Sequence, residues 1–207
     1  MAKIKDALVL TVITLIAGFL LGGVYELTKD PIAQQQIEAN AKAYQAVLPN
    51  AVEFRSEDAL AGKVAVAEGI LGQSDLAVEQ VTIDTAVYAY DGAGNFAGLV
   101  VEATSKDGYG GAITLAVGIQ EQEAGPAVTG IDFLEINETA GLGMKATEPA
   151  FKEQFQNKQV EHFELTKDGA TEEYQVDALS GATRTSNAVT NAVNGALYFA
   201  REAALRQ

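Results

Sequence analysis

The sequence predicts an α+β fold in which an antiparallel sheet with flanking helices follows an amino-terminal transmembrane helix and a connector helix. Three observations favour this architecture: an uncharged apolar run near the start, four strand-like runs separated by turns, and a helical repeat at the end. With 207 residues, the chain is long enough for one substantial core and an appendage. The expected parts are an amino terminus over 1–6, a transmembrane helix over 7–25, a connector helix over 26–50 and one domain over 51–207.

The apolar run covers residues 7–25 (ALVLTVITLIAGFLLGGVY) and holds no charged side chain. Nineteen helical residues at ~1.5 Å each span roughly 28 Å, close to the hydrocarbon thickness of a bilayer. A secretory signal peptide is the alternative, but such a peptide ends in small residues at a cleavage site, whereas YELTKDPI follows here. Thr14, Gly18 and Gly22 recur every four residues, which favours close contact with helices of partner membrane subunits.

The distribution of charge sets the expected orientation. Lys3 and Lys5 precede the apolar run, so the positive-inside tendency keeps the amino terminus in the cytoplasm and exports the domain across the cell (inner) membrane in a single pass. Residues 1–30 carry three basic and three acidic side chains, so the whole net charge of −14 falls beyond Pro31. An acidic domain of this kind is repelled by nucleic acid and by anionic lipid headgroups, so no nucleic-acid partner is expected.

Sequence patterns also locate the elements of the exported part. Asp30 and Pro31 form a helix start, and the spacing of Ile37, Ala41 and Tyr44 continues that helix toward the VLPN segment. The remaining expected elements are strands over 81–90, 96–104, 112–119, 128–136 and 161–166, a short helix over 149–157, and an amphipathic helix over 185–207 with Val189, Val193, Leu197 and Ala200 on one face.

The residue types that are missing exclude several kinds of chemistry. Cysteine is absent and His162 is the single histidine, so the chain offers no disulfide, no thiolate ligand for an iron–sulfur cluster and no histidine-rich metal site. Any redox chemistry must therefore use a bound organic cofactor. A hydrolase is not favoured, because Ser180 has only His162, on an expected strand, as a base. Glu135 and Glu138 could act as an acid–base pair, but acidic residues are common in this chain.

The segment DALSGATRTS, residues 177–186, leaves an expected strand and runs directly into the last helix. Ser180, Thr183, Thr185 and Ser186 place four hydroxyls at the helix start, where free N–H groups and the helix dipole favour an anion. The pattern indicates a phosphate site. The alternative is that these side chains only cap the helix, as Ser and Thr commonly do.

Two glycine-rich segments are candidates for the rest of such a site. Residues 138–143 (ETAGLG) follow a strand, and their glycines let the backbone approach a flat ligand whose ring Leu142 or Met144 can cover. Residues 108–111 (GYGG) precede another strand, and Tyr109 can stack or form a hydrogen bond there. An ordinary glycine-rich turn is the alternative for each segment.

These segments resemble a known family of flavoproteins. DALSGAT matches Asp-x-x-Ser/Thr-Gly-Ala-Ser/Thr, the flavinylation pattern of the FMN-binding domain shared by G subunits of Rnf-type ion-translocating oxidoreductases and C subunits of sodium-pumping NADH:quinone reductases. The resemblance implies a covalent FMN, joined by a phosphoester to Thr183. ETAGLG is similar to the family's Glu-Thr-Pro-Gly-Leu-Gly loop, with Ala140 in place of proline and Asn137 where a histidine often stands. The other cofactor-binding residues that the resemblance implies are Ser180, Gly181, Ala182, Arg184 and Thr185 at the helix start, Glu138, Thr139, Gly141, Leu142, Gly143 and Met144 in the loop, and Tyr109 and Gly110.

The resemblance, which covers nearly the whole chain, also implies a function. It indicates an electron-relay subunit of an Rnf-type complex that couples ferredoxin:NAD electron transfer to sodium or proton translocation, with no catalytic residues of its own. The implied partners are other membrane and iron–sulfur or flavin subunits, and a flavin transferase for maturation. The alternatives are a quinone-reductase C-type subunit, a stand-alone anchored flavin domain, or an anchored binding module without redox activity.

Overall fold

The structure of the chain, a computed structural model, describes residues 10–20 and 37–205. Two units are distinguished, Met1–Ala39 and Asn40–Gln207. Residues 10–20 are helical, as are residues 37–47. Within these described stretches, no helix is both long enough and apolar enough to cross a membrane. The transmembrane helix over 7–25 and the connector helix over 26–50 extend beyond the described residues, so both stay predictions.

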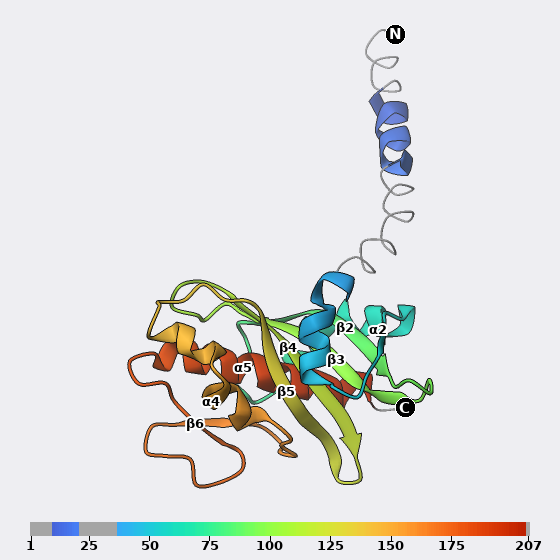
Figure 1. Cartoon of the computed structure of the whole chain (residues 1–207). Coiled ribbons are helices and arrows are strands. Elements are labelled where there is room, and N and C mark those ends of the chain that lie inside the picture. Colours follow the sequence, from blue (N-terminus) through green and yellow to red (C-terminus); the bar gives the residue numbers. More distant parts are fainter. Residues whose placement is uncertain (1–9, 21–36, 206–207) are drawn as a thin grey trace. The chain divides into compact units, whose positions relative to one another are not determined.

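An antiparallel sheet of five strands, arranged in the order of the chain, forms the centre of the second unit (Figure 1). The four long strands confirm the strand runs expected from the sequence, with small shifts at their ends. The turn between the second and third strands is held by the Asp91 carboxylate, which accepts hydrogen bonds from the N–H groups of Ala93 and Asn95. The strands are β1 (Glu53–Arg55), β2 (Val81–Tyr90), β3 (Phe96–Ser105), β4 (Ile113–Gln122) and β5 (Gly125–Glu135).

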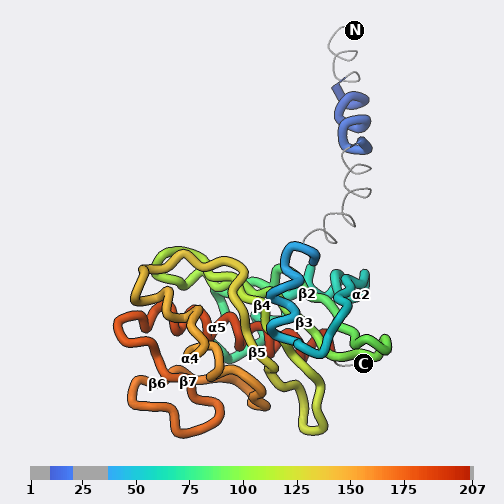
Figure 2. The backbone as a smooth tube through the Cα atoms, viewed as in Figure 1, coloured from blue at the N-terminus to red at the C-terminus, as the bar shows by residue number. Residues whose placement is uncertain are grey.

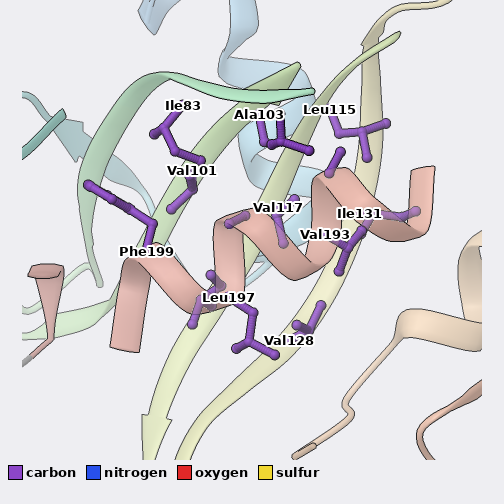
Figure 3. Packing of buried hydrophobic residues seen from close by; sticks show 14 of the residues in the cluster. Ile83, Val101, Ala103, Leu115, Val117, Val128, Ile131, Val193, Leu197 and Phe199 are labelled. Atoms are coloured by element: carbon purple, nitrogen blue, oxygen red, sulfur yellow. The ribbon is translucent and has the colours of Figure 1, made fainter. Parts of the chain in front are cut away.

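Helices cover both faces of this sheet. Because successive side chains of a strand point to opposite faces, alternate residues of the central strands enter different layers. Val101 and Val117 pack on the face covered by α5 (Thr183–Phe199), as Figure 3 shows. Glu102, the next residue after Val101 on β3, points to the opposite face, which residues 40–47 cover. The second unit is therefore built as helix, sheet and helix.

The helical segment before the sheet is fixed by polar contacts and one close backbone approach. The Tyr44 hydroxyl is buried and donates a hydrogen bond to Oε1 of Glu102 at 2.6 Å. The Thr129 hydroxyl donates to the carbonyl oxygen of Val47 at 2.6 Å. A Cβ at Gly118 would lie 2.5 Å from that same carbonyl oxygen, so only glycine allows this approach. The segment is thus packed directly onto the sheet.

The helix α5 begins at Thr183, two residues before the expected start, because the preceding SGA turn already directs the chain into the helix. Its expected apolar face is confirmed, since Val189, Val193 and Leu197 are fully buried. Other sides of the helix are buried as well. The Asn194 side chain accepts a hydrogen bond from the Phe163 N–H at 2.7 Å and donates one to its carbonyl oxygen at 2.9 Å. The helix continues into a π-helical turn, η3 (Ala200–Ala204).

The smaller elements differ more from expectation. The helix expected over 149–157 is shorter and divides into α4 (Pro149–Lys152) and a 3-10 turn, η2 (Glu153–Phe155). The strand expected over 161–166 is reduced to β6 (Glu164–Thr166), so the placement of His162 on a strand was wrong. The other short elements are α2 (Asp58–Val64), α3 (Ala67–Leu71), a 3-10 helix η1 (Gly143–Thr147), and β7 (Gln175–Asp177), which pairs in parallel with β6 (Figure 2).

Candidate functional site

The start of α5 is open to a ligand. Gly181 has φ +75°, a left-handed conformation that glycine adopts readily, and the turn brings Thr183 to the first helical position. Ala182 occupies the capping position, and among the described residues no side chain caps the helix. The first backbone N–H groups of a helix have no acceptor within the helix itself. Those of α5 are therefore available to an acceptor outside it.

The Ser186 hydroxyl, one of the four expected at the ligand site, stabilises the turn before the helix instead. The Ser186 hydroxyl donates to the carbonyl oxygen of Ala182 at 3.1 Å and accepts from the N–H of Leu179 at 3.0 Å. The side chain is buried, so it holds the turn before the helix rather than facing a ligand. The Thr183 side chain is half-buried instead, and it lines a cleft described below.

The glycine-rich segment 138–143 packs against this helix start. A Cβ at Gly143 would lie 2.7 Å from Oγ1 of Thr185 and 2.8 Å from both Cβ and Oε2 of Glu138. Atoms in ordinary contact lie about 3.5–4.0 Å apart, so glycine is needed at this crossing. Gly141, with φ +75°, lets the segment turn back on itself. The backbone N–H of Leu142 closes that turn by donating to the carbonyl oxygen of Thr139 at 3.1 Å.

The second glycine-rich segment, 108–111, completes the arrangement. The backbone N–H of Tyr109 donates to Oε1 of Glu138 at 2.8 Å. A Cβ at Gly110 would collide with the carbonyl oxygen of Asn137, so this glycine lets the two segments meet. Nε of Arg184 donates to the carbonyl oxygen of Asp107 at 2.8 Å and ties the helix start to the same segment. Three stretches far apart in sequence are therefore joined directly.

Between them lies a cleft of about 360 Å³, which we call the α5 cleft. This volume falls within the range of roughly 300–1,000 Å³ common for small-molecule sites. Four residues expected at the site do not line the cleft: Ser180, Gly110, Gly141 and Met144. Asp107, whose carbonyl oxygen accepts the hydrogen bond from Arg184, was not expected at the site. Every residue has a backbone carbonyl, so the sequence gives no signal for this contact. The residues that line the cleft are Tyr109, Glu138, Thr139, Leu142, Gly143, Gly181, Ala182, Thr183, Arg184 and Thr185.

The chemistry of the α5 cleft suits a molecule with an anionic end and a flat apolar end. Backbone N–H groups, the positive end of the helix dipole and the Arg184 guanidinium favour a phosphate. Leu142 and Tyr109 are 44% and 73% exposed, so their apolar surfaces are available to a planar ring. Over the described part of the chain, no group of three or more acidic or histidine side chains is placed to hold a metal ion. The residues present therefore fit a flavin mononucleotide.

Comparison with known proteins agrees with this fit. The family model of the FMN-binding domain matches residues 108–198, and that of the RnfG N-terminal region matches residues 1–47. The chain is 31% identical over 193 residues to the G subunit of the Na(+)-translocating ferredoxin:NAD(+) oxidoreductase complex of Acetobacterium woodii, covering 92% of this chain and 87% of that one. It is 32% identical over 195 residues to the G subunit of the ion-translocating oxidoreductase complex of Methanosarcina acetivorans, covering 94% and 93%.

Among solved structures, the C subunit of the Na(+)-translocating NADH-quinone reductase from Parabacteroides distasonis shows a distant likeness only. Its TM-score is 0.44 at 19% identity, over 84% of this chain and 96% of that chain. The family is set instead by the sequence matches, which extend over most of both chains. The chain belongs to the family of G subunits of ion-translocating oxidoreductase complexes and contains their FMN-binding domain.

Proposed function

We propose that this chain is a membrane-anchored electron-relay subunit that carries one FMN, joined through a phosphoester to Thr183. It works within an Rnf-type complex that couples ferredoxin:NAD electron transfer to sodium or proton translocation. The observation that carries the proposal is the α5 cleft, where the Thr183 hydroxyl, an uncapped helix start and two glycine-rich segments meet. The names of the relatives support the same complex.

The helix start supports a phosphoester at Thr183. A phosphodiester keeps one negative charge, which backbone N–H donors and a helix dipole stabilise without a bound cation. The Arg184 guanidinium uses Nε to hold Asp107, and its planar shape leaves further N–H groups for an anion. A covalent link also removes the loss of translational freedom that a freely exchanging cofactor would suffer at each encounter.

The two glycine-rich segments support the ring of the cofactor. Leu142 and Tyr109 offer apolar surface, and the Thr139 hydroxyl offers a hydrogen bond at the same wall. Flavin supplies the acceptance and release of electrons when it is bound. The protein binds and orients it, and the Glu138 contact to Tyr109 keeps the two segments at a fixed separation. In the electron relay itself, none of the side chains that line the cleft needs to act as a nucleophile or a general base.

We further propose that residues 7–25 anchor the chain in the cell (inner) membrane, with the amino terminus in the cytoplasm and the FMN-binding domain outside. The uncharged run, the match of residues 1–47 to the RnfG N-terminal region, and Lys3 and Lys5 on the short side support this orientation. Its partners are the other membrane and iron–sulfur or flavin subunits of the complex, and a flavin transferase during maturation.

The attachment is tested by comparing Thr183→Val with Thr139→Val after co-expression with a flavin transferase. Both changes replace a hydroxyl by a methyl group in the same cleft, but only the first removes the proposed attachment atom. We expect the wild type and Thr139→Val to fluoresce as denatured bands and to gain the mass of one FMN less water. Thr183→Val should fold, as judged by circular dichroism, without that mass. A Thr183→Val chain that still carries covalent flavin would rule out this residue as the attachment site.

The orientation has its own test. Reversing the charges of Lys3 and Lys5 to glutamate should reduce the fraction of chains whose domain is outside, because the positive-inside signal is lost. Protease added to spheroplasts should degrade the domain of the wild type and spare more of the variant. Equal protection of both chains would contradict the proposed orientation.

A further inference from the structure

A second cavity, of about 660 Å³, lies at the other end of α5. Its floor is formed by the rings of Tyr88, Tyr90 and Phe96, and Leu205 closes one side. We call this cavity the aromatic groove. It lies between the ends of β2 and β3, the helix α2 and the last turn of η3. None of its residues lines the α5 cleft.

The three rings are packed so that part of their surface faces solvent. Phe96 meets Tyr88 and Tyr90 edge to face, with ring centroids 5.8 Å and 6.3 Å apart. Such a geometry fixes the rings in place. Phe96 is nevertheless 47% exposed, so a large part of its ring is open to solvent. The groove thus offers a preformed aromatic surface.

The hydroxyl groups of the two tyrosines are already used. Tyr90 donates to Oε1 of Glu57 at 2.9 Å, and Tyr88 donates to the carbonyl oxygen of Ala204 at 3.4 Å. Burial, followed by the nearby Glu57 carboxylate, raises the pKa of both tyrosines, so both stay neutral near pH 7. A ligand would therefore meet ring faces rather than free hydroxyls.

The electrostatic character of the groove favours a cation. Among the described residues, Glu57 and Glu121 line it with Lys63, and the adjacent Arg55 is paired with Glu53, so one net negative charge is left. The carbonyl end of the last helical turn, at Ala204, adds partial negative charge there. Aromatic ring faces attract cations through their quadrupole. An anion or an anionic lipid headgroup would be repelled.

A neighbouring contact shows that one of these rings already accepts a guanidinium. The Arg55 guanidinium lies over the Tyr90 ring, 4.6 Å from its centroid. That arginine is held by two hydrogen bonds of 2.7 Å to Glu53, so carboxylate and ring act on it together. The groove repeats this combination of carboxylate and aromatic ring on a larger, accessible surface.

We propose that the aromatic groove binds an arginine or lysine side chain on an otherwise apolar segment of a partner polypeptide. The ring floor takes the apolar part and the guanidinium or ammonium, while Glu57 and Glu121 offset its charge. Thr183 and Ala204 stand 21 positions apart along one continuous helix, roughly 30 Å, so a partner can occupy the groove while the α5 cleft stays accessible. The proposal does not depend on the cofactor.

The test uses the full chain in detergent micelles, with isotope-labelled tyrosine and phenylalanine rings followed by NMR. The probes are acetyl-Leu-Arg-Leu-amide and the same peptide with citrulline, which keeps the shape of arginine but lacks its charge. We expect saturable shifts of the three floor rings with the arginine peptide. Affinity for the citrulline peptide should be about 3 to 30 times lower, as expected for loss of a cation–π contact.

Variants locate the binding. Phe96→Leu should weaken binding of the arginine peptide at least about threefold, and Glu121→Gln, at an exposed rim position, should weaken it without a folding risk. Tyr174→Leu, a matched loss of an exposed ring outside the groove, should have no effect. Equal binding of the two peptides, or no saturable shift, would overturn the proposal. The proposal would also be overturned if the arginine peptide bound only to the Arg206→Gln variant, because the chain's own arginine would then be the occupant of the groove.

Discussion

Replacing Gly143 by alanine should loosen the α5 cleft at the point where its walls cross. The new Cβ would lie 2.7 Å from Oγ1 of Thr185 and 2.8 Å from Cβ of Glu138, against about 3.5–4.0 Å for ordinary contact. Neither neighbour can move easily, because Thr185 is buried and Glu138 is held by the N–H of Tyr109. Overpacking of this kind costs about 1–3 kcal/mol. For a chain of this size, that cost lowers Tm by roughly 2–12 °C.

The matched control is Gly92→Ala. No atom lies within 4 Å of a Cβ at Gly92, so this variant shows only the general effect of removing a glycine from the unfolded chain. Thermal unfolding followed by circular dichroism compares the two, and denaturing-gel fluorescence reports how much covalent flavin each acquires. We expect Gly143→Ala to unfold at a lower temperature and to carry less flavin. Equal Tm values for the two variants would refute the close crossing of loop and helix.

Three further changes probe the frame around the cleft. Asn194→Ala should lower the free energy of unfolding by at least about 2 kcal/mol in urea, because both backbone groups of Phe163 lose their partner. The exposed Asn187→Ala on the same helix should change it little, and a similar loss there would contradict this account. Gly118→Ala should cost about 1–3 kcal/mol by collision with the helix that covers that face, and unchanged stability would mean that the helix is not packed there. Burial and the Glu102 hydrogen bond raise the pKa of Tyr44 above that of an unfolded tyrosine, so its contribution is complete below about pH 10 and is lost as the pH rises further. Between pH 10 and 11.5, the free energy of unfolding measured in urea should fall with pH more steeply in the wild type than in Tyr44→Phe, by up to about 1.4 kcal/mol per pH unit. Equal slopes for the two chains would contradict the raised pKa of Tyr44.

Local patterns were sufficient to predict the sheet and the last helix. Strands such as 81–90 combine β-branched and aromatic residues and end in glycine-rich or Asn-containing turns, which are strong local signals. The faces of α5 were less predictable. Val189, Val193 and Leu197 mark one buried face, but Asn194 reads as a polar, solvent-facing residue in sequence. Asn194 is buried because it binds the backbone N–H and carbonyl oxygen of Phe163, which lies in a distant segment. A helical repeat in the sequence cannot reveal such a contact.

The candidate site was predictable by composition but not by geometry. The hydroxyls of 180–186 and the glycines of 138–143 indicated two walls, yet their contact at Gly143 follows only from the fold. Ser186 looked equivalent to Thr183 in sequence, whereas the structure gives it a buried role in the turn. The aromatic groove left no signal, because its rings come from strands where aromatic residues ordinarily fill a core. The helices α2 and α3 were missed because each is too short for a periodic pattern.

The two-sided covering of the sheet bears on how the domain responds to tension. Any pull exerted through the chain ahead of Asn40 enters the domain on the Tyr44 side, where a buried hydroxyl–carboxylate contact and a tight backbone approach at Gly118 resist it. The helix α5 belongs to the other face of the sheet, and its start is held by the segments 108–111 and 138–143. The contacts that would carry such a load are therefore different from those that set the spacing around Thr183.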